Sequence, residues 1–330
     1  MSGANPQKLR ILLIGAGAVG QVYGRHLQLG GAEVAFYVKP KYADEARAGY
    51  RMYPLNQGRD VPAVVWKDFG VRTDLPATLA QGWDQVWLCV STTALFGPWL
   101  DELAQHLGSA DLVALQPGVL AEERLVPLFG KERITWGGIS MISYQTPLDG
   151  EAREPGVAYW FPPMGPSPFW GPRAQLAVDA LKRGKCPAAV NPGGSAQMRY
   201  GSAILMPHLV ALEGAGWSFA KVREGSWLAQ ASAASREAAQ AVSAYTGDPV
   251  PLGVRLLRPW HIGLLSRLAP SLLPLPIEIY LQYHFTKVGD QTRAMMKDYQ
   301  RLAREKQLPG EAMAQLVKSA NLSLDAPAQG

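Results

Sequence analysis

The chain has 330 residues, 48% hydrophobic and 18% charged, which is the balance of an ordinary globular protein long enough for two domains. Its net charge of +5 comes from scattered Lys and Arg, which argues against nucleic-acid binding and fits an anionic cofactor and a small anionic substrate. The two cysteines, Cys89 and Cys186, provide neither a disulfide framework nor a ligand set, so we expect no metal. The sequence shows no signal peptide and no apolar run of about 18 residues, which predicts a cytoplasmic protein without stable membrane association.

The most informative segment lies near the amino terminus. An apolar run of strand length (11–14) leads into a G-x-G-x-x-G fingerprint, and a helical pattern continues to residue 29. In this pattern Gly15 permits the tight turn, Gly17 lets the backbone approach a diphosphate, and Gly20 allows close helix–strand packing. The free N–H groups and the positive dipole end of the helix face the phosphates. We therefore predict dinucleotide binding by Gly15, Ala16, Gly17, Ala18, Val19 and Gly20.

The rest of the first half alternates apolar runs with helical patterns, as in a doubly wound α/β sheet. We expect helices at 20–29, 99–107 and 173–181, and strands at 11–14, 33–38, 61–66, 85–90, 111–115, 134–143 and 157–161. The last two strands are expected to close the sheet. A stretch rich in Pro and Gly leads to a boundary near 185–191. Helical patterns follow at 196–215, 226–245, 290–306 and 310–319. The prediction is a Rossmann domain at 1–188 and an all-helical domain at 189–330.

The loop after the second predicted strand indicates which nicotinamide nucleotide binds. NAD enzymes usually place an acid at the end of that strand, where it bonds the ribose 2′-hydroxyl. Here the strand is followed by Lys39-Pro40-Lys41, and the first acid is Asp44. Two cations suit a 2′-phosphate, which a carboxylate would repel. We predict NADP, bound by Lys39 and Lys41, against the alternative of a solvated basic loop.

Further motifs lie outside the fingerprint. Tyr23-Gly24 follows it, and Thr292-Arg293 and the pattern Tyr299…Lys306-Gln307-Leu308-Pro309 lie near the carboxyl terminus. With these motifs the chain resembles the ketopantoate reductase family over nearly its whole length. The resemblance implies a Rossmann domain joined to a helical domain of the 6-phosphogluconate-dehydrogenase type. It also implies hydride transfer from NADPH to a 2-oxo acid bound between the domains and, commonly, a homodimer.

The chain departs from the family at several functional positions. Among the cofactor contacts that the resemblance implies, Ser91 replaces a lysine and Pro117 replaces the Asn of an Asn-Gly pair. On the first helix of the second domain Arg199 stands where the family has a lysine, and the asparagines expected further along are absent. Arg293 replaces a glutamate. Because buried polar contacts discriminate strongly between substrates, we expect a substrate other than ketopantoate.

Three residues are candidates for the chemistry at the carbonyl. Arg199 and Arg293 can hold a carboxylate or stabilise developing negative charge, but a guanidinium does not donate a proton at working pH. His208 titrates in the right range, although a lone histidine on an apolar helix is more often structural. Pro207 argues against an unbroken helix between Arg199 and His208. Alternatives for the missing donor are His284 and Lys287.

The leading hypothesis is NADPH-dependent reduction of a carboxylate-bearing ketone or imine. Two alternatives stay open, namely an opine-type reductive-amination dehydrogenase and a non-catalytic dinucleotide-binding or sensing protein. The segment 250–276 is rich in Leu and broken by prolines, which prevent a long amphipathic helix. We therefore expect this segment to be a packed cap or a subunit contact of a homodimer, and not a membrane-surface helix.

Overall fold

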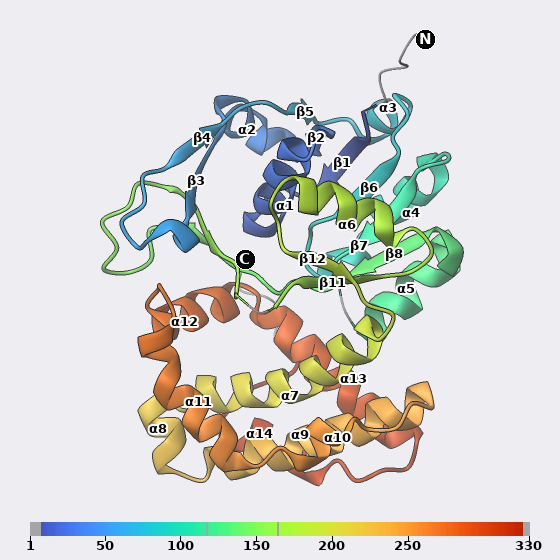
Figure 1. The fold of residues 1–330 in the computed structure, drawn as a ribbon. Coiled ribbons are helices and arrows are strands. Elements are labelled where there is room, and N and C mark those ends of the chain that lie inside the picture. The colour runs from blue at the N-terminus through green and yellow to red at the C-terminus, as the bar shows by residue number, and fades with distance from the viewer. Residues whose placement is uncertain (1–7, 117, 164, 326–330) are drawn as a thin grey trace. The chain divides into compact units, whose positions relative to one another are not determined.

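The computed structural model describes residues 8–116, 118–163 and 165–325, which form two compact units (Figure 1). The first unit holds Ala121–Ser195 and the described residues before position 117. The second unit holds Gly118–Leu120 and the described residues from Ala196 onward. These units are defined by compactness alone, and the domain bounds 1–188 and 189–330 stay a prediction.

The first unit is built on an eight-stranded sheet of the Rossmann type. Its strands are β1 (Arg10–Ile14), β2 (Glu33–Tyr37), β5 (Gly70–Arg72), β6 (Gln85–Leu88), β7 (Asp111–Ala114), β8 (Ile134–Gly137), β11 (Ser167–Trp170) and β12 (Ala188–Val190). They follow the order β12-β11-β8-β7-β6-β1-β2-β5, and only the pair β8–β11 is antiparallel. The strand order reverses between β1 and β6, which is the point where open α/β sheets bind their ligands.

A second sheet of four strands lies in the same unit. It holds β3 (Tyr50–Pro54), β4 (Val64–Trp66), β9 (Ile142–Thr146) and β10 (Gly156–Trp160) in the order β4-β3-β10-β9. The prediction that segments 134–143 and 157–161 close the main sheet is therefore wrong beyond Gly137. Apolar periodicity identifies a strand but not the sheet that the strand joins. Strands β11 and β12, from the stretch rich in Pro and Gly, complete the main sheet instead.

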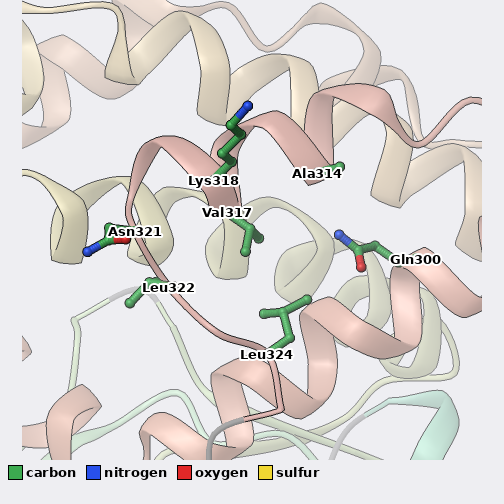
Figure 2. Close-up of a pocket in the computed structure, with 7 residues that line it drawn as sticks. All are labelled: Gln300, Ala314, Val317, Lys318, Asn321, Leu322 and Leu324. Atoms are coloured by element: carbon green, nitrogen blue, oxygen red, sulfur yellow. The ribbon is translucent and has the colours of Figure 1, made fainter.

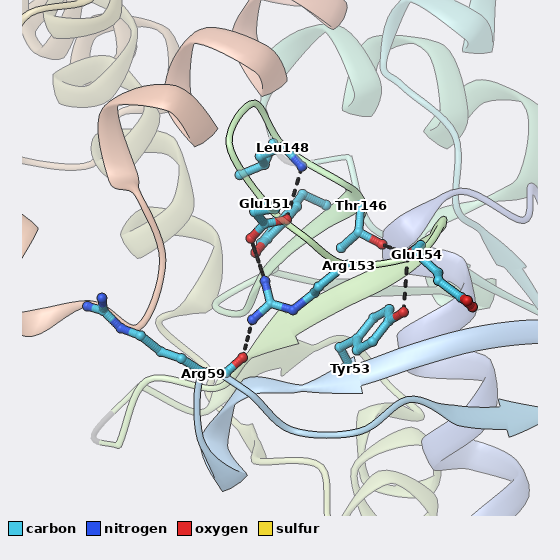
Figure 3. A network of polar contacts seen from close by, with 8 residues as sticks. Tyr53, Arg59, Thr146, Leu148, Glu151, Arg153 and Glu154 are labelled. Carbon is cyan, nitrogen blue, oxygen red and sulfur yellow. Dashed lines mark hydrogen bonds and ion pairs between the residues drawn. The ribbon is translucent and has the colours of Figure 1, made fainter.

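An ion pair with little solvent exposure holds the turn between β9 and β10 (Figure 3). The side chains of Arg153 and Glu151 are 16% and 10% exposed and form a salt bridge. Glu151 also accepts hydrogen bonds from the Tyr144 hydroxyl (2.7 Å) and the Leu148 amide (3.0 Å), and Arg153 donates to the Arg59 carbonyl. Both charges thus gain several hydrogen bonds, which is the condition under which a buried ion pair is tolerated.

Helix α1 (Ala18–Leu29) and helix α6 (Ala174–Arg183) pack together, and the glycines that follow their C-terminal ends lie in close contact. A Cβ on Gly30 would overlap the carbonyl oxygen of Ala180, and a Cβ on Gly184 would overlap that of His26. His26 Nδ1 donates to the Gly184 carbonyl at 2.7 Å, and burial lowers the pKa of this imidazole. The C-terminal end of α1 is therefore held by contacts that only glycine permits. The remaining helices and 3-10 turns that lie wholly or partly in this unit are η1 (Pro40–Tyr42), α2 (Ala43–Ala48), η2 (Leu55–Gln57), α3 (Leu75–Leu79), η3 (Thr93–Phe96), α4 (Trp99–His106), α5 (Val119–Phe129) and η4 (Lys131–Arg133).

The described part of the second unit is helical, which confirms the predicted fold class. Its helices are α7 (Gly194–Gly214), α8 (Phe219–Glu224), α9 (Trp227–Thr246), α10 (Leu252–Leu256), α11 (Pro259–Leu272), α12 (Ile277–Lys287), α13 (Gly289–Glu305) and α14 (Glu311–Ser319). Helix α9 is rich in Ala and packs on α13 and α14, because small side chains allow helices to approach closely. In the part of the chain described here, no single helix is long and apolar enough to cross a membrane. Helices α11 and α12 meet that test only as a pair, bent by 107°.

Helix α7 continues without a break through Pro207. The expectation that this proline interrupts the helix is therefore wrong. A proline in a helix interior removes one backbone hydrogen bond and crowds the preceding turn, and packing on both sides can still hold the helix together. Met206 and Leu209 next to Pro207 are buried in the core of the second unit.

Candidate cofactor and substrate sites

The turn between β1 and α1 has the geometry of a diphosphate-binding cradle. Gly15 has a φ of +101°, and a Cβ there would lie 2.8 Å from the carbonyl oxygen of Cys89. A Cβ on Gly20 would overlap the carbonyl oxygen of Gly15. A Cβ on Gly17, by contrast, would meet nothing within 4 Å among the described residues. The outer two glycines are thus required by the protein itself, whereas the middle one faces open space that a diphosphate can enter.

The N-terminus of α1 offers its amides at the same place. The helix begins at Ala18 after Gly17, which has extended backbone and no side chain to cap the first turn. The first turn contains no acidic residue. Gln21 Nε2 donates to the Ala16 carbonyl at 2.8 Å and so fixes the turn. An uncapped N-terminus with its dipole end exposed is suited to an anion, so the backbone of Ala16, Ala18 and Val19 fits its predicted role.

The loop after β6 forms the other wall of the cradle, and Gln116 holds that loop in place. Gln116 is 3% exposed and donates from Nε2 to the carbonyl oxygens of Leu88 (2.9 Å) and Val90 (2.6 Å). Its Oε1 is buried without a partner among the residues that the structure describes. Sequence reasoning missed this role, although a polar side chain directly after a buried strand was a usable signal. The adjacent Pro117, a predicted cofactor contact, lies outside the described residues.

Ser91, another predicted cofactor contact, lies in this loop where η3 begins. Its Oγ is 3.0 Å from Thr93 Oγ1 and accepts a longer hydrogen bond from the Ala94 amide at 3.4 Å. The hydroxyl therefore caps a local turn. A contact to cofactor would have to share it, so the predicted role stays a prediction.

The end of β2 is surrounded by cations. Lys39 and Lys41 follow the strand and are exposed, and the Lys41 ammonium lies 4.8 Å from the centre of the Tyr42 ring. The first acid, Asp44, is paired with Arg47 at 2.8 Å. The positive charge here therefore suits a bound 2′-phosphate better than a ribose 2′-hydroxyl, which would need a carboxylate as its partner.

The backbone of Arg72 lies beside the end of β2 through strand pairing, but its guanidinium turns back along β5, where Nη1 is 3.0 Å from the position that a Cβ on Gly70 would take. β5 pairs with β2 in a register that sets Arg72 opposite Tyr37, and the Val38 amide donates to the Arg72 carbonyl at 2.9 Å. The guanidinium donates to Gln81 Oε1 at 3.2 Å. Sequence reasoning did not find Arg72, because 34 intervening positions hide a neighbour that only the sheet register reveals.

In the second unit Arg199 lies near the start of α7. Its side chain is 15% exposed, and Nη1 is 3.9 Å from Oδ2 of Asp248, whose side chain is 56% exposed. The hydroxyl of the neighbouring Tyr200 donates to the Asp248 carbonyl at 2.9 Å, which fixes the loop after α9 against α7. The guanidinium is therefore at the edge of solvent beside a long, weak ion pair.

Arg293 lies at the other end of α7. Its Nη2 donates to Glu213 Oε1 at 2.8 Å and its Nη1 to the Gly289 carbonyl at 3.1 Å. Because a helix rises about 1.5 Å per residue, Glu213 lies about 20 Å from Arg199 along α7. The structure therefore does not bring the two predicted arginines together on one carboxylate.

His208 points into the second unit. Its Nδ1 lies 2.7 Å from the Ile204 carbonyl and 3.4 Å from Ser235 Oγ, and burial lowers the pKa of the imidazole. Since α7 is unbroken, the nine positions from Arg199 to His208 set the two side chains on opposite faces at about 100° per residue. The burial of His208 and its contacts within the second unit are typical of a histidine with a structural role. The role of proton donor stays a prediction that the geometry does not favour.

The two alternative donors, His284 and Lys287, lie in different surroundings. Burial, with a smaller contribution from Lys287, lowers the pKa of His284 to about 4, and its ring stacks on Tyr280 at 5.5 Å. Lys287 is exposed, with its ammonium 6.0 Å from the centre of the Tyr283 ring. His284 is thus neutral at physiological pH.

A shallow pocket of about 430 Å³ lies in the second unit, away from every predicted site residue (Figure 2). The pocket is lined by Gln300, Ala314, Val317, Lys318, Asn321, Leu322 and Leu324.

Among the described residues no group of three or more His, Cys, Asp or Glu side chains is placed to hold a metal ion.

Comparison with known proteins identifies relatives of this fold. Residues 11–159 match the model of the family described as ketopantoate reductase PanE/ApbA. The structure is similar to 2-dehydropantoate 2-reductase from Geobacter metallireducens GS-15, with 16% identity and a TM-score of 0.68 over 95% of this chain and 99% of that one. The corresponding enzyme from Methylococcus capsulatus gives 16% identity and a TM-score of 0.69 over 98% and 100%.

A third similar structure is the ternary structure of D-mandelate dehydrogenase with NADH and anilino(oxo)acetate. It shares 12% identity, with a TM-score of 0.68 over 95% of this chain and 97% of that one. No curated protein matches the chain in sequence. At these identities the solved structures establish a common fold.

Proposed function

We propose that the chain, whose residues 11–159 match the ketopantoate reductase family, is a divergent relative of that family and an NADPH-dependent reductase of a carboxylate-bearing ketone or imine other than ketopantoate. The family is one of NAD(P)H-dependent oxidoreductases, and the chain is an oxidoreductase of this kind. The observation that carries the proposal is the cradle, where Gly17 faces open space at the uncapped start of α1. Bound NADPH supplies the hydride.

Two cations support NADP over NAD. Lys39 and Lys41 follow the end of β2, where a 2′-phosphate needs positive charge. The similar D-mandelate dehydrogenase was solved with NADH, so the choice of nucleotide varies on this fold. Lys39→Asp puts a carboxylate at this position. We expect the ratio of NADPH to NADH affinity, measured by calorimetry, to fall at least about tenfold, because a charge-assisted bond is replaced by repulsion.

The matched control is Lys131→Asp, which makes the same charge change on η4 at the amino-terminal side of β8. Lys131 is 79% exposed and lies at the sheet edge opposite the one that the cradle occupies. We expect its nucleotide ratio to equal that of the unmodified chain. Equal ratios in all three proteins would remove Lys39 from the site.

On the substrate side we assign Arg199 the holding of the substrate carboxylate. Its ion pair with Asp248 is long, at 3.9 Å, and Asp248 is itself more than half exposed, so an anionic substrate can take its place. The guanidinium stabilises negative charge but does not protonate the developing alkoxide. Arg293 is held by Glu213 and is not needed for this step.

A panel of 2-oxo acids, offered with and without amines, tests the reaction through oxidation of NADPH. We expect turnover with a 2-oxo acid other than ketopantoate, and Arg199→Met should raise KM for it at least about tenfold. Turnover that requires an amine would identify an opine-type dehydrogenase. Turnover of ketopantoate at about 10 s⁻¹, a median enzyme rate, would contradict the proposed substrate. NADPH binding without any turnover would identify a binding protein.

A further inference from the structure

Helices α10 and α11 present apolar side chains to solvent. On α11 the exposed side chains are Trp260, Leu264, Leu265, Leu268 and Leu272, between 44% and 71% exposed. On α10, Leu252 and Leu256 are exposed by 67% and 57%. We refer to these residues as the α10–α11 face. Single exposed leucines are ordinary on a protein surface, but a group on adjacent short helices marks an interaction site.

The geometry of α11 makes this face a stripe. Trp260, Leu264, Leu268 and Leu272 are spaced by four residues and so lie along one side of the helix. The opposite side packs on α8 and α9, where the Arg223 guanidinium donates to buried Ser266 at 3.3 Å. Helix α11 runs for 14 residues through Pro270. The segment thus forms short helices, as its prolines predict, and one of them is long enough to carry an apolar stripe.

The acidic and basic residues within this segment are all basic. Arg255, Arg258 and Arg267 are exposed within or beside the stripe. Between positions 249 and 277 the sequence contains no Asp or Glu. An apolar stripe that carries Trp and Leu and is flanked by Arg is the pattern of a helix that lies in the boundary between lipid headgroups and acyl chains.

We propose that the α10–α11 face docks on the surface of an anionic lipid bilayer. Trp260 and the leucines enter the headgroup boundary, and the three arginines contact lipid phosphates. A second copy of the chain is a poorer occupant. A two-fold contact centred on this face would bring the three arginines of each copy, Arg255, Arg258 and Arg267, into one interface, and the segment 249–277 has no acid to pair with them. This inference is independent of the proposed reaction.

Co-sedimentation of the full chain with vesicles tests the proposal. We expect binding to vesicles of phosphatidylglycerol and phosphatidylcholine, weaker binding as NaCl rises, and little binding to phosphatidylcholine alone. The triple variant R255Q/R258Q/R267Q should lower the partition coefficient by more than about tenfold, since each arginine contributes roughly fivefold. The apolar variant W260S/L264S should lower it by a similar factor.

Matched variants separate this face from general effects of charge and hydrophobicity. K67Q/K131Q/K318Q removes the same net charge from exposed positions elsewhere, and Leu176→Ser removes a leucine that is 48% exposed on α6. Both should bind vesicles as the unmodified chain does. Circular dichroism verifies that each variant is folded.

Two results would overturn the proposal. One is a lack of binding to anionic vesicles at low salt, or binding that all variants share. The other is a stable dimer in sedimentation velocity that W260S/L264S dissociates, because the face would then belong to a second copy.

Discussion

The proposed cofactor cradle and the proposed substrate side of this protein are built from different kinds of groups, backbone in one and side chains in the other. The cradle consists of backbone, in that Gly15 and Gly20 close the turn while Gly17 opens it to the diphosphate. The proposed substrate side consists of side chains, with Arg199 beside Asp248. A site made of backbone is defined by the absence of a Cβ, so it has few acceptable alternatives. A site made of side chains can change its charges and keep its helices.

The largest effect is expected from a pair of glycine substitutions in the cradle. Gly20→Ala places a Cβ onto the Gly15 carbonyl, so we expect a loss of roughly 4 kcal/mol in the free energy of unfolding and no measurable NADPH binding. Gly17→Ala meets nothing within 4 Å among the described residues, and its φ of −69° suits alanine. It should change stability by less than about 0.5 kcal/mol.

Gly17→Ala nevertheless should weaken NADPH binding at least about tenfold, since its Cβ enters the space of the diphosphate. Urea denaturation and calorimetry measure the two quantities separately. If Gly17→Ala bound NADPH normally, the cradle would not be a diphosphate site, and the contrast between the two sides would fail.

The next effect concerns the pH dependence of stability in the second unit. Burial lowers the pKa of His284 to about 4 from 6.5, so the unfolded chain binds a proton below about pH 6.5 that the folded chain does not. The free energy of unfolding should therefore fall by about 2 kcal/mol between pH 7 and pH 5, and the loss is complete only below pH 4. Burial also lowers the pKa values of His26 and His208, which adds to the loss in the same direction.

His284→Phe keeps a ring against Tyr280 and removes the titrating group. Chemical denaturation at both pH values should show a smaller drop in this variant than in the unmodified chain. An equal drop would show that His284 is not buried in its neutral form. His284 would then again be a candidate proton donor for the proposed substrate site.

The smallest effect separates the two arginines. Arg293→Met and Glu213→Gln each break the pair between α13 and α7, and each should cost about 1 to 2 kcal/mol of stability. Because this pair is structural in our assignment, kcat/KM should be similar in the two variants. A loss in Arg293→Met at least about tenfold beyond that in Glu213→Gln would place Arg293 on the substrate instead.

The sequence was sufficient to predict the parts of the protein that depend on local pattern. The six adjacent residues from Gly15 to Gly20 predict a tight turn, a backbone open to a diphosphate and close helix–strand packing. The helical periodicity of the second half predicts its fold. These features need no knowledge of distant neighbours.

The missed features all depend on distant neighbours. The backbone of Arg72 lies beside the end of β2 only through strand register, and Gln116 reaches the loop after β6 only because β7 lies beside β6. The second sheet pairs β10 with β3 across about a hundred residues, which periodicity cannot anticipate. The ion pair of Glu213 with Arg293 likewise joins two helices that are far apart in sequence.

The close contact of Gly30 with Gly184, between the C-terminal ends of α1 and α6, has a consequence at the opposite end of α1. Gly30 and Gly184 fix that helix about 18 Å from the amides that meet the diphosphate, given 12 residues at about 1.5 Å each. The amides are thereby oriented before any nucleotide arrives, so association costs little backbone entropy. On the proposed site, the affinity for the dinucleotide then depends partly on packing at the far end of α1.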